Sequence, residues 1–295
     1  MRKLKHSGRA AVSLSRHSRA DPSARRLKEI PIASTTEGRA GLRARLAAGE
    51  TLVGTFLNTG SAISAEICGR AGFDWLLIDL EHGSGSEADL QHQLHAVAGT
   101  ASAAIVRVES NARPRVAKAL DLGAEGIMFP QVHSADDVRA AISYLKYPPE
   151  GVRGLAFSNR AHAFTPRDLS AVEAANERAV GVIQIESAAA VAAAEEIASI
   201  EGVDALFVGP NDLSLSLGVH GQYDSRRYLE AVERVAAATK ATGKAAGVLT
   251  PTADGLDRYL ARGFRLLTVG SDGAFLVAGA SGAVAGTRAR ASAGV

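Results

Sequence analysis

The sequence predicts an α/β fold in which eight parallel strands close into a single (β/α)₈ TIM barrel. From about residue 40, short segments rich in Val, Ile and Leu alternate with longer amphipathic segments. There are eight such strand–helix units, which is the number that a barrel of about 250 residues contains. A doubly wound open sheet would need a glycine-rich phosphate loop after its first strand, and the glycines of GTFLNTGSA are too widely spaced for one.

Each element follows from its own residues. Continuous apolar runs predict strands buried on both faces at 51–57, 74–80, 102–108, 125–130, 179–186, 204–209, 244–249 and 265–270. Helical periodicity predicts helices at 41–50, 61–72, 86–99, 112–123, 134–147, 187–200, within 224–242, 252–263 and 272–286. The connection 148–178 is unusually long. Its first part, 148–165, contains Arg153, Arg160 and His162 and is a candidate lid; the alternative is a surface excursion with a short helix at 168–177.

The charge of the chain is concentrated at its start. Residues 1–28 hold nine Lys or Arg against one acid, Asp21, so this stretch carries +8 and the remainder −6. Residues 1–38 therefore read as a disordered basic extension, although their composition also resembles an organellar transit peptide. Residues 39–295 form the predicted barrel domain. This domain has no basic stripe with interleaved aromatic residues, which argues against nucleic-acid binding.

Other classes of protein are excluded by what the sequence lacks. No apolar run reaches the roughly 18–20 residues of a membrane span, so we expect no membrane association and a cytoplasmic enzyme. The single cysteine, Cys68, excludes an internal disulfide framework and a cysteine zinc cluster, and its helical context predicts a small core residue. Lysines stand on predicted helices or at the wrong end of a strand, which excludes a Schiff-base aldolase.

Polar residues follow several of the predicted strands at their carboxyl ends. They are Asp79, Glu81 and His82 after the second strand, Arg107 on the third, Gln184 and Glu186 on the fifth, and Gly209, Pro210, Asn211 and Asp212 after the sixth. In a (β/α)₈ barrel these strand ends meet at one mouth, where active sites are built. The sequence therefore predicts one site that gathers these side chains.

Residue type indicates what this site can bind. Glu186 and Asp212 suit a hard divalent cation such as Mg²⁺ or Mn²⁺, although each alone could serve a helix N-terminus, Asp212 as its N-cap. His82 is either a plain loop histidine or an acid–base group oriented by Asp79. Arg107 alternates with Ile105 along its strand and points inward, so it either pairs with a local acid or binds an anionic substrate.

Several segments together resemble one family. GFDWLLIDLEH, IVRV, YPPEGVRG, VIQIE and GVDALFVGPNDLS look like the HpcH/HpaI aldolases, and the resemblance runs from about residue 40 to 280. It implies metal-dependent class II pyruvate aldolases, such as the 4-hydroxy-2-oxoheptanedioate and 2-dehydro-3-deoxyglucarate enzymes. They cleave a 4-hydroxy-2-keto acid into pyruvate and an aldehyde. It also implies a homo-oligomer, typically a hexamer built from dimers that exchange the last helix.

The resemblance further implies a role for each site residue. Glu186 and Asp212 would bind Mg²⁺ or Mn²⁺, with Co²⁺ as a third candidate, and Arg107 would stabilise the enolate oxygen. His82, assisted by Asp79, would be the acid–base group. The substrate-binding residues would be Gln184, Gly209, Pro210, Asn211 and Leu249.

Two departures from the family pattern leave the aldehyde open. Asn211 stands where a small residue is expected, and Leu80 stands where glycine is common. A related metal barrel acting as a CoA-ester lyase or an oxaloacetate decarboxylase, and a non-catalytic barrel that binds a keto acid, remain alternatives.

Overall fold

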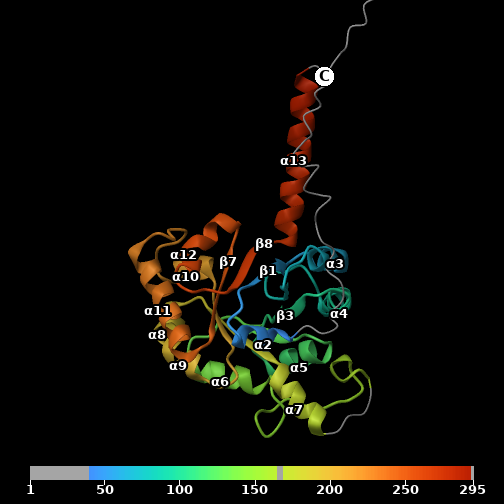
Figure 1. Cartoon of the computed structure of the whole chain (residues 1–295), viewed down its shortest axis with the longest axis vertical. Helices are drawn as coiled ribbons and strands as arrows, with labels where there is room; N and C mark the ends of the chain where they lie inside the picture. The colour runs from blue at the N-terminus through green and yellow to red at the C-terminus, as the bar shows by residue number, and fades with distance from the viewer. Residues whose placement is uncertain (1–39, 165–168, 294–295) are drawn as a thin grey trace, which may run out of the picture. The chain divides into compact units, whose positions relative to one another are not determined.

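Eight parallel strands close into a barrel in chain order, each pairing with its neighbours in sequence and the last with the first (Figure 1). This computed structural model describes residues 40–164 and 169–293, so the predicted extension 1–38 lies outside the described residues. The strands are β1 Leu52–Leu57, β2 Trp75–Asp79, β3 Ala103–Arg107, β4 Gly126–Phe129, β5 Val180–Ile185, β6 Ala205–Val208, β7 Ala245–Thr250 and β8 Leu266–Ser271. The predicted α/β barrel is confirmed.

Alternate residues of the strands face the barrel interior. The interior cluster takes Trp75 and Leu77 from β2 and Ala103 and Ile105 from β3, while the residues between them pack outward against the helices. Phe207 of β6 meets the Trp75 ring edge-on at 6.1 Å between centroids, so bulky side chains fill the barrel. This packing makes the barrel a solid core, and the charged side chains described below lie at the strand ends.

The close fit of this core explains one glycine. Gly54 of β1 lies beside the Trp75 indole, and a Cβ at this position would stand 2.6 Å from a ring carbon. No side chain can occupy that space without displacing the indole, which is fully buried. The glycine therefore allows the largest side chain of the interior to lie across two neighbouring strands.

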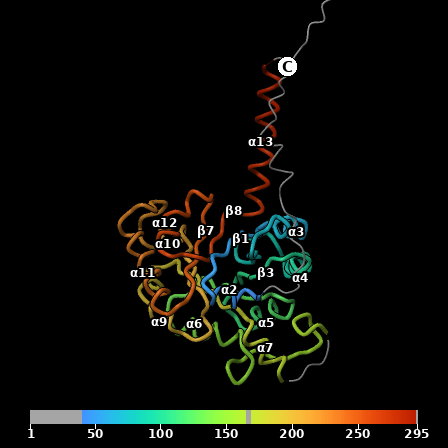
Figure 2. The backbone as a smooth tube through the Cα atoms, in the orientation of Figure 1, coloured from blue at the N-terminus to red at the C-terminus, as the bar shows by residue number. Residues whose placement is uncertain are grey.

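The helices lie outside the strands (Figures 1 and 2). They are α2 Leu42–Ala47, α3 Ala62–Arg70, α4 Glu87–Val97, α5 Arg113–Asp121, α6 Ala135–Ser143, α7 Leu169–Arg178, α8 Ala188–Ala192, α9 Ala194–Ser199, α10 Pro210–Ser216, α11 Arg226–Thr242, α12 Asp257–Leu260 and α13 Asp272–Ser292, with short η1 Arg160–His162 and η2 Ala253–Leu256. No described helix is both long and apolar enough to cross a bilayer.

The helices differ from prediction at four places, one of which is α10 Pro210–Ser216, for which no helix was predicted. The helix expected at 187–200 is two, because Ala193 leaves helical geometry at φ −91° and ψ 4° and caps both. The helix expected at 252–263 is a 3₁₀ turn followed by a single α-helical turn. The final helix, expected at 272–286, continues to Ser292 and is the longest of the described helices, and its residues beyond Gly273 are mostly exposed.

The candidate lid does not cover the barrel mouth in the structure. One of the two arginines of this segment, Arg153, is buried and pairs with Asp121 of α5 at 2.7 Å. The Arg153 guanidinium stacks over the Tyr147 ring. His162 is buried as well and contacts the Tyr147 hydroxyl at 3.0 Å. The described part of 148–165 thus packs against the outer helices, and the alternative of a surface excursion with its own helix, α7, fits better.

Candidate active site

A cavity of about 500 Å³ opens at the carboxyl ends of the strands. It is lined by most of the residues predicted from the sequence: Asp79, His82, Arg107, Gln184, Gly209, Pro210, Asn211, Asp212 and Leu249. Glu186 lies directly behind this wall, because a Cβ on Gly209 would stand 3.2 Å from its Oε2 atom. Two further hollows, of about 400 and 440 Å³, contain none of the predicted residues.

The pleat of the strands places these side chains. Trp75 and Leu77 face inward on β2, so the next residue of that row, Asp79, also faces inward. The same alternation carries Arg107 on β3 and Gln184 on β5 into the mouth. Asp79 and Arg107 are register partners on adjacent strands, which brings their side chains together.

Arg107 is a buried cation held by two carboxylates. Its Nε and Nη2 donate to the two oxygens of Asp79 at 2.9 and 2.7 Å, a bidentate pair. Its Nη1 lies 3.0 Å from Glu81 Oε2 and 3.4 Å from Gln184 Oε1, and the guanidinium sits 5.2 Å from the Phe56 ring centroid. Of the two possibilities left open for Arg107, pairing with a local acid is observed. The surrounding contacts fix the guanidinium in one orientation.

Asp79 contacts His82 differently from the dyad expected from the sequence. Its Oδ1 accepts hydrogen bonds from the main-chain N–H groups of Glu81 and His82, at 3.0 and 3.3 Å. The imidazole Nε2 instead lies 3.8 Å from Glu81 Oε2, and the side chain is 67% exposed. The carboxylate is already committed to Arg107, so it shapes the turn that carries His82 without touching the ring.

Glu186 is a buried carboxylate with neutral donors. Its Oε1 accepts from the Gln131 N–H at 2.6 Å and its Oε2 from the Gln184 amide. Burial raises the pKa of Glu186; the Gln131 N–H opposes this shift, and the negative charges of Glu81 and Asp212 add to it. The positive charge of Arg107 also lowers this pKa, and burial is the largest of these effects.

The N-cap interpretation of Asp212 does not fit the structure, although both acids lie at a helix N-terminus, where a negative charge is favourable. Ser187 is the N-cap of α8, and its hydroxyl accepts from the Ala190 N–H, so Glu186 is not needed there. Gly209 is the N-cap position of α10, and Asp212 stands in the first turn with an exposed side chain. Both carboxylates are left available to a ligand at the mouth.

These residues fit a hard divalent cation. Two carboxylates with substrate and water oxygens are a typical magnesium set, and manganese accepts the same ligands. Within the described residues, no three His, Cys, Asp or Glu side chains cluster as an all-protein metal site would require. A cation at Glu186 and Asp212 would also offset the charge that raises the Glu186 pKa.

Two residues of the site were not assigned from the sequence. Gln131 uses its main-chain N–H for Glu186 and its side-chain amide for Glu81 Oε1 at 2.7 Å, and it adopts a left-handed φ of 54° to do so. Glu81 was noted only as an acid after a strand, yet it bridges Gln131 and Arg107. The order of residues gives no signal for Gln131, because its role depends on its backbone conformation.

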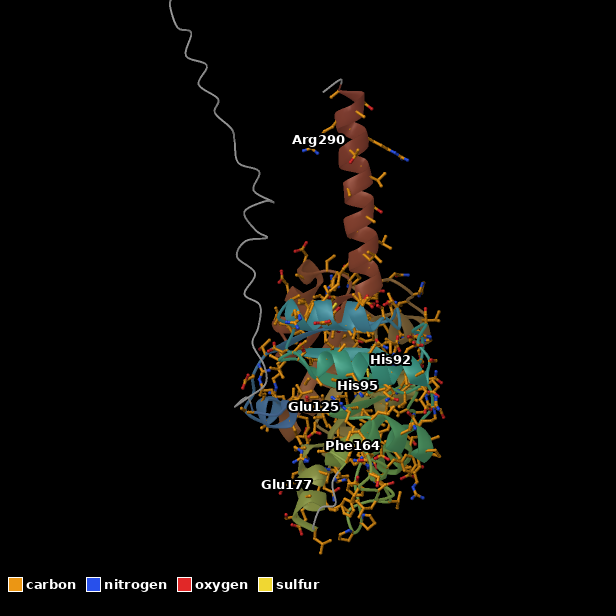
Figure 3. The ribbon with its side chains drawn as sticks, turned by 90° about the vertical axis from the view of Figure 1, so that its right-hand side faces the viewer. His92, His95, Glu125, Phe164, Glu177 and Arg290 are labelled. Atoms are coloured by element: carbon orange, nitrogen blue, oxygen red, sulfur yellow. The ribbon has the colours of Figure 1, made fainter. Side chains whose placement is uncertain are left out.

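The opposite wall of the cavity was also missed. It is formed by the ends of β1, β7 and β8 and by residues of η2, α12 and α13: Asn58, Thr250, Pro251, Gly255, Arg258, Tyr259, Gly270, Ser271 and Ala274. Tyr223 joins the two walls, because its hydroxyl donates to Asn211 Oδ1 at 2.6 Å. The histidines of α4, His92 and His95, lie exposed on the outer face, away from this cavity (Figure 3).

Known proteins are similar to this chain in both sequence and fold. The family model described as HpcH/HpaI aldolase/citrate lyase matches residues 52–278. The chain belongs to this family. It is therefore an aldolase, a carbon–carbon lyase, and the resemblance read from the sequence is confirmed. The family model spans all eight strands and every residue that lines the cavity.

Individual relatives cover the same region. A 5-keto-4-deoxy-D-glucarate aldolase of Salmonella paratyphi C is 38% identical over 235 residues, which is 79% of this chain and 91% of the relative. A solved HpcH/HpaI aldolase/citrate lyase family protein from Burkholderia cenocepacia superposes with a TM-score of 0.80 at 37% identity, covering 84% of this chain and 98% of that one. An HpcH/HpaI aldolase from Desulfitobacterium hafniense gives 0.79 at 31%, covering 85% and 97%.

Proposed function

We propose that the chain cleaves 4-hydroxy-2-keto acids into pyruvate and an aldehyde, and joins them in reverse, with a divalent metal ion. The observation that carries the proposal is the meeting of a fixed buried cation, Arg107, with two carboxylates, Glu186 and Asp212, at one cavity. An enolate of pyruvate carries its charge on an oxygen, and such an arrangement is suited to hold that oxygen.

The residues have distinct tasks in this proposal. Glu186 and Asp212 would hold Mg²⁺ or Mn²⁺, with Co²⁺ as a third candidate, and a bound cation would supply Lewis-acid polarisation of the keto group. Arg107, held in place by Asp79, would donate to the oxygen on which charge develops. The main chain at Gly209, Pro210 and Asn211, with Gln184 beside it, would hold the substrate carboxylate.

Proton transfer falls to His82. It lines the cavity and is open to solvent, so it can exchange its proton with water between turnovers. It would accept the proton of the C4 hydroxyl as the C3–C4 bond breaks, leaving the bonding electron pair on C3 as the enolate. Protonation of C3 then gives the methyl group of pyruvate, and C4 leaves as the aldehyde carbon. Leu249 would line the space beside the reacting carbons.

We infer that the substrate class is 2-keto-3-deoxy sugar acids. The relative at 38% identity bears the name 5-keto-4-deoxy-D-glucarate aldolase. A polar opposite wall with Asn58, Ser271 and Tyr223 supports a hydroxylated acceptor, because these groups can exchange hydrogen bonds with sugar hydroxyls.

The test is pyruvate release from a panel of 4-hydroxy-2-keto acids, 5-keto-4-deoxy-D-glucarate among them. Protein treated with a chelator should be inactive and should recover with Mg²⁺ or Mn²⁺. Glu186→Gln should stay inactive, whereas Glu196→Gln, which changes an exposed acid on α9, should behave as wild type. Cleavage that survives chelation would contradict the metal mechanism. Release of CO₂ from oxaloacetate without any aldol cleavage would favour the decarboxylase alternative.

We also propose that copies of the chain assemble through α13. Its residues Phe275, Leu276, Val277 and Val284 are exposed apolar side chains in succession on one helix. Sedimentation should show a homo-oligomer, dimeric or hexameric, and Leu276→Glu with Val277→Glu should shift it toward the monomer. A wild-type monomer would contradict this assembly.

A further inference from the structure

One cationic side chain that lines the cavity, Arg258, has no role in the proposed chemistry at Glu186 and Asp212. Besides the hydroxyl groups of Tyr223 and Tyr259, the charged or titratable side chains that line the cavity are Asp79, His82, Arg107, Asp212 and Arg258. Asp79 and Arg107 neutralise each other, and Asp212 stands with the proposed metal. Arg258 comes from α12, between β7 and β8, whereas the metal residues come from the ends of β5 and β6. It therefore places a positive charge on the opposite wall.

The contacts of Arg258 leave most of its donors available. Its Nη1 donates to the Tyr223 carbonyl oxygen at 3.0 Å and lies 2.8 Å from Asp224 Oδ1. In the described part of the chain, no acceptor contacts its Nε or Nη2. The Asp224 side chain is 88% exposed, so this ion pair is made in water and contributes little. The Arg258 side chain is 33% exposed and lines the cavity.

The surroundings of Arg258 suit a carboxylate. Ser271 and Asn58 line the same wall, and Asn58 Nδ2 donates to Ser271 Oγ at 3.4 Å, so the serine hydroxyl is free to donate onward. Tyr223 is fixed by its bond to Asn211 at the other wall. A guanidinium with free parallel N–H groups binds a carboxylate at two points, which an ammonium or a neutral donor does not.

We propose that Arg258 binds the second carboxylate of the substrate, the one at the end remote from the keto group. This inference rests on the proposed aldolase function and specifies its substrate as a 2-keto dicarboxylic acid. When the six-carbon diacid is cleaved between C3 and C4, the three carbons bearing that carboxylate leave as an aldehyde. Arg258 thus recognises the aldehyde half, and Arg107 with the metal residues recognises the pyruvate half.

The experiment compares two substrates in three variants. The substrates are 5-keto-4-deoxy-D-glucarate and 4-hydroxy-2-ketopentanoate, which has a methyl group where the diacid carries its remote end. Arg258→Gln should raise the KM of the diacid about 10- to 100-fold and leave that of the monoacid within about twofold. The KM of the diacid in Arg258→Lys should lie between those of wild type and Arg258→Gln, because lysine keeps the positive charge but lacks the paired N–H groups of a guanidinium. Arg226→Gln, which changes a 91% exposed arginine on α11, is the matched control and should change neither.

Asp224→Asn separates recognition from a structural role. It removes the exposed acid that competes for Arg258, so the KM of the diacid should fall about two- to threefold. A purely structural ion pair would respond to both changes in the same direction and for both substrates. That result, or a diacid KM unchanged in Arg258→Gln, would overturn the proposal.

Exchange of the pyruvate methyl protons for deuterium, followed by NMR, keeps the two proposals apart. The exchange reports enolate formation and involves no aldehyde, so Arg258→Gln should leave it unchanged. If wild type with Mg²⁺ shows no exchange, the aldolase mechanism fails and this proposal fails with it. If exchange is normal and the selectivity for the diacid does not depend on Arg258, only the carboxylate site is refuted.

Discussion

Replacing Asp79 with asparagine tests how the buried cation of the site is held. In the structure both carboxylate oxygens of Asp79 accept hydrogen bonds from Arg107, at 2.9 and 2.7 Å. Their side chains are 3% and 8% exposed, so the pair is shielded from water. Asparagine keeps the shape and one acceptor but removes the charge, and leaves Arg107 with Glu81 as its only contacting carboxylate.

The size of the effect follows from this geometry. Removing one partner of a buried ion pair typically costs about 3–5 kcal/mol. Because Glu81 Oε2 stays 3.0 Å from Nη1, we expect the lower end, about 3 kcal/mol of unfolding free energy. For a domain of this size that corresponds to a fall in Tm of roughly 6–12 °C. Glu196→Gln, which breaks an exposed pair with Arg139 at 2.7 Å, should cost less than about 0.5 kcal/mol.

Thermal unfolding and steady-state kinetics measure the two consequences. Asp79→Asn should lower Tm as stated and reduce kcat, because Arg107 loses its orientation. It should not move the midpoint of the pH–rate profile, since Asp79 touches His82 only through main-chain N–H groups. A fall in Tm no larger than that of Glu196→Gln would contradict the claim that Asp79 stabilises the buried Arg107. A displaced pH midpoint would instead restore Asp79 as a direct partner of the His82 ring.

Three further predictions follow from single contacts. Gly54→Ala should destabilise the barrel by about 1–3 kcal/mol, measured by denaturant unfolding, because its Cβ would press on the Trp75 indole. Gly99→Ala, whose Cβ would make only an ordinary contact at 3.5 Å, should not. Burial, reinforced by Asp272, raises the pKa of Cys68 to about 11, so a thiol reagent at about pH 8 should label it only after unfolding. Burial raises the pKa of Glu186, so this side chain takes up a proton at a higher pH than an ordinary carboxylate does, and the Mg²⁺ affinity measured by calorimetry should weaken as the pH falls. An affinity that does not change with pH would contradict its role as a ligand.

The barrel could be predicted from the sequence because each strand carries its own signal. Runs such as the one that contains Val182 and Ile183 are too apolar for a strand buried on one face only. Eight such runs that alternate with helices are compatible with few fold topologies. The strand ends then place Arg107, Glu186 and Asp212 together without knowledge of any contact. Helix boundaries were less predictable, since the break at Ala193 lies within an alanine-rich stretch that has no local stop signal.

The partners within the site could not be predicted in the same way. Asp79 and His82 are three residues apart, a spacing that suggested a dyad, but the direction of a carboxylate depends on the neighbouring strand. There Arg107 is its register partner, and the charge attraction decides the pairing. Arg258 belongs to a single helical turn after a 3₁₀ segment, and only the closed barrel brings it to the cavity.

The central claim, that this cavity generates the enolate of pyruvate with a metal at Glu186 and Asp212, is tested most directly by deuterium exchange. Pyruvate is incubated in D₂O with chelator-treated protein, with and without Mg²⁺ or Mn²⁺, and its methyl signal is followed by NMR. The exchange should require the metal and should be lost in Glu186→Gln. Exchange that persists without metal or in Glu186→Gln, or no exchange under any condition, would contradict this claim.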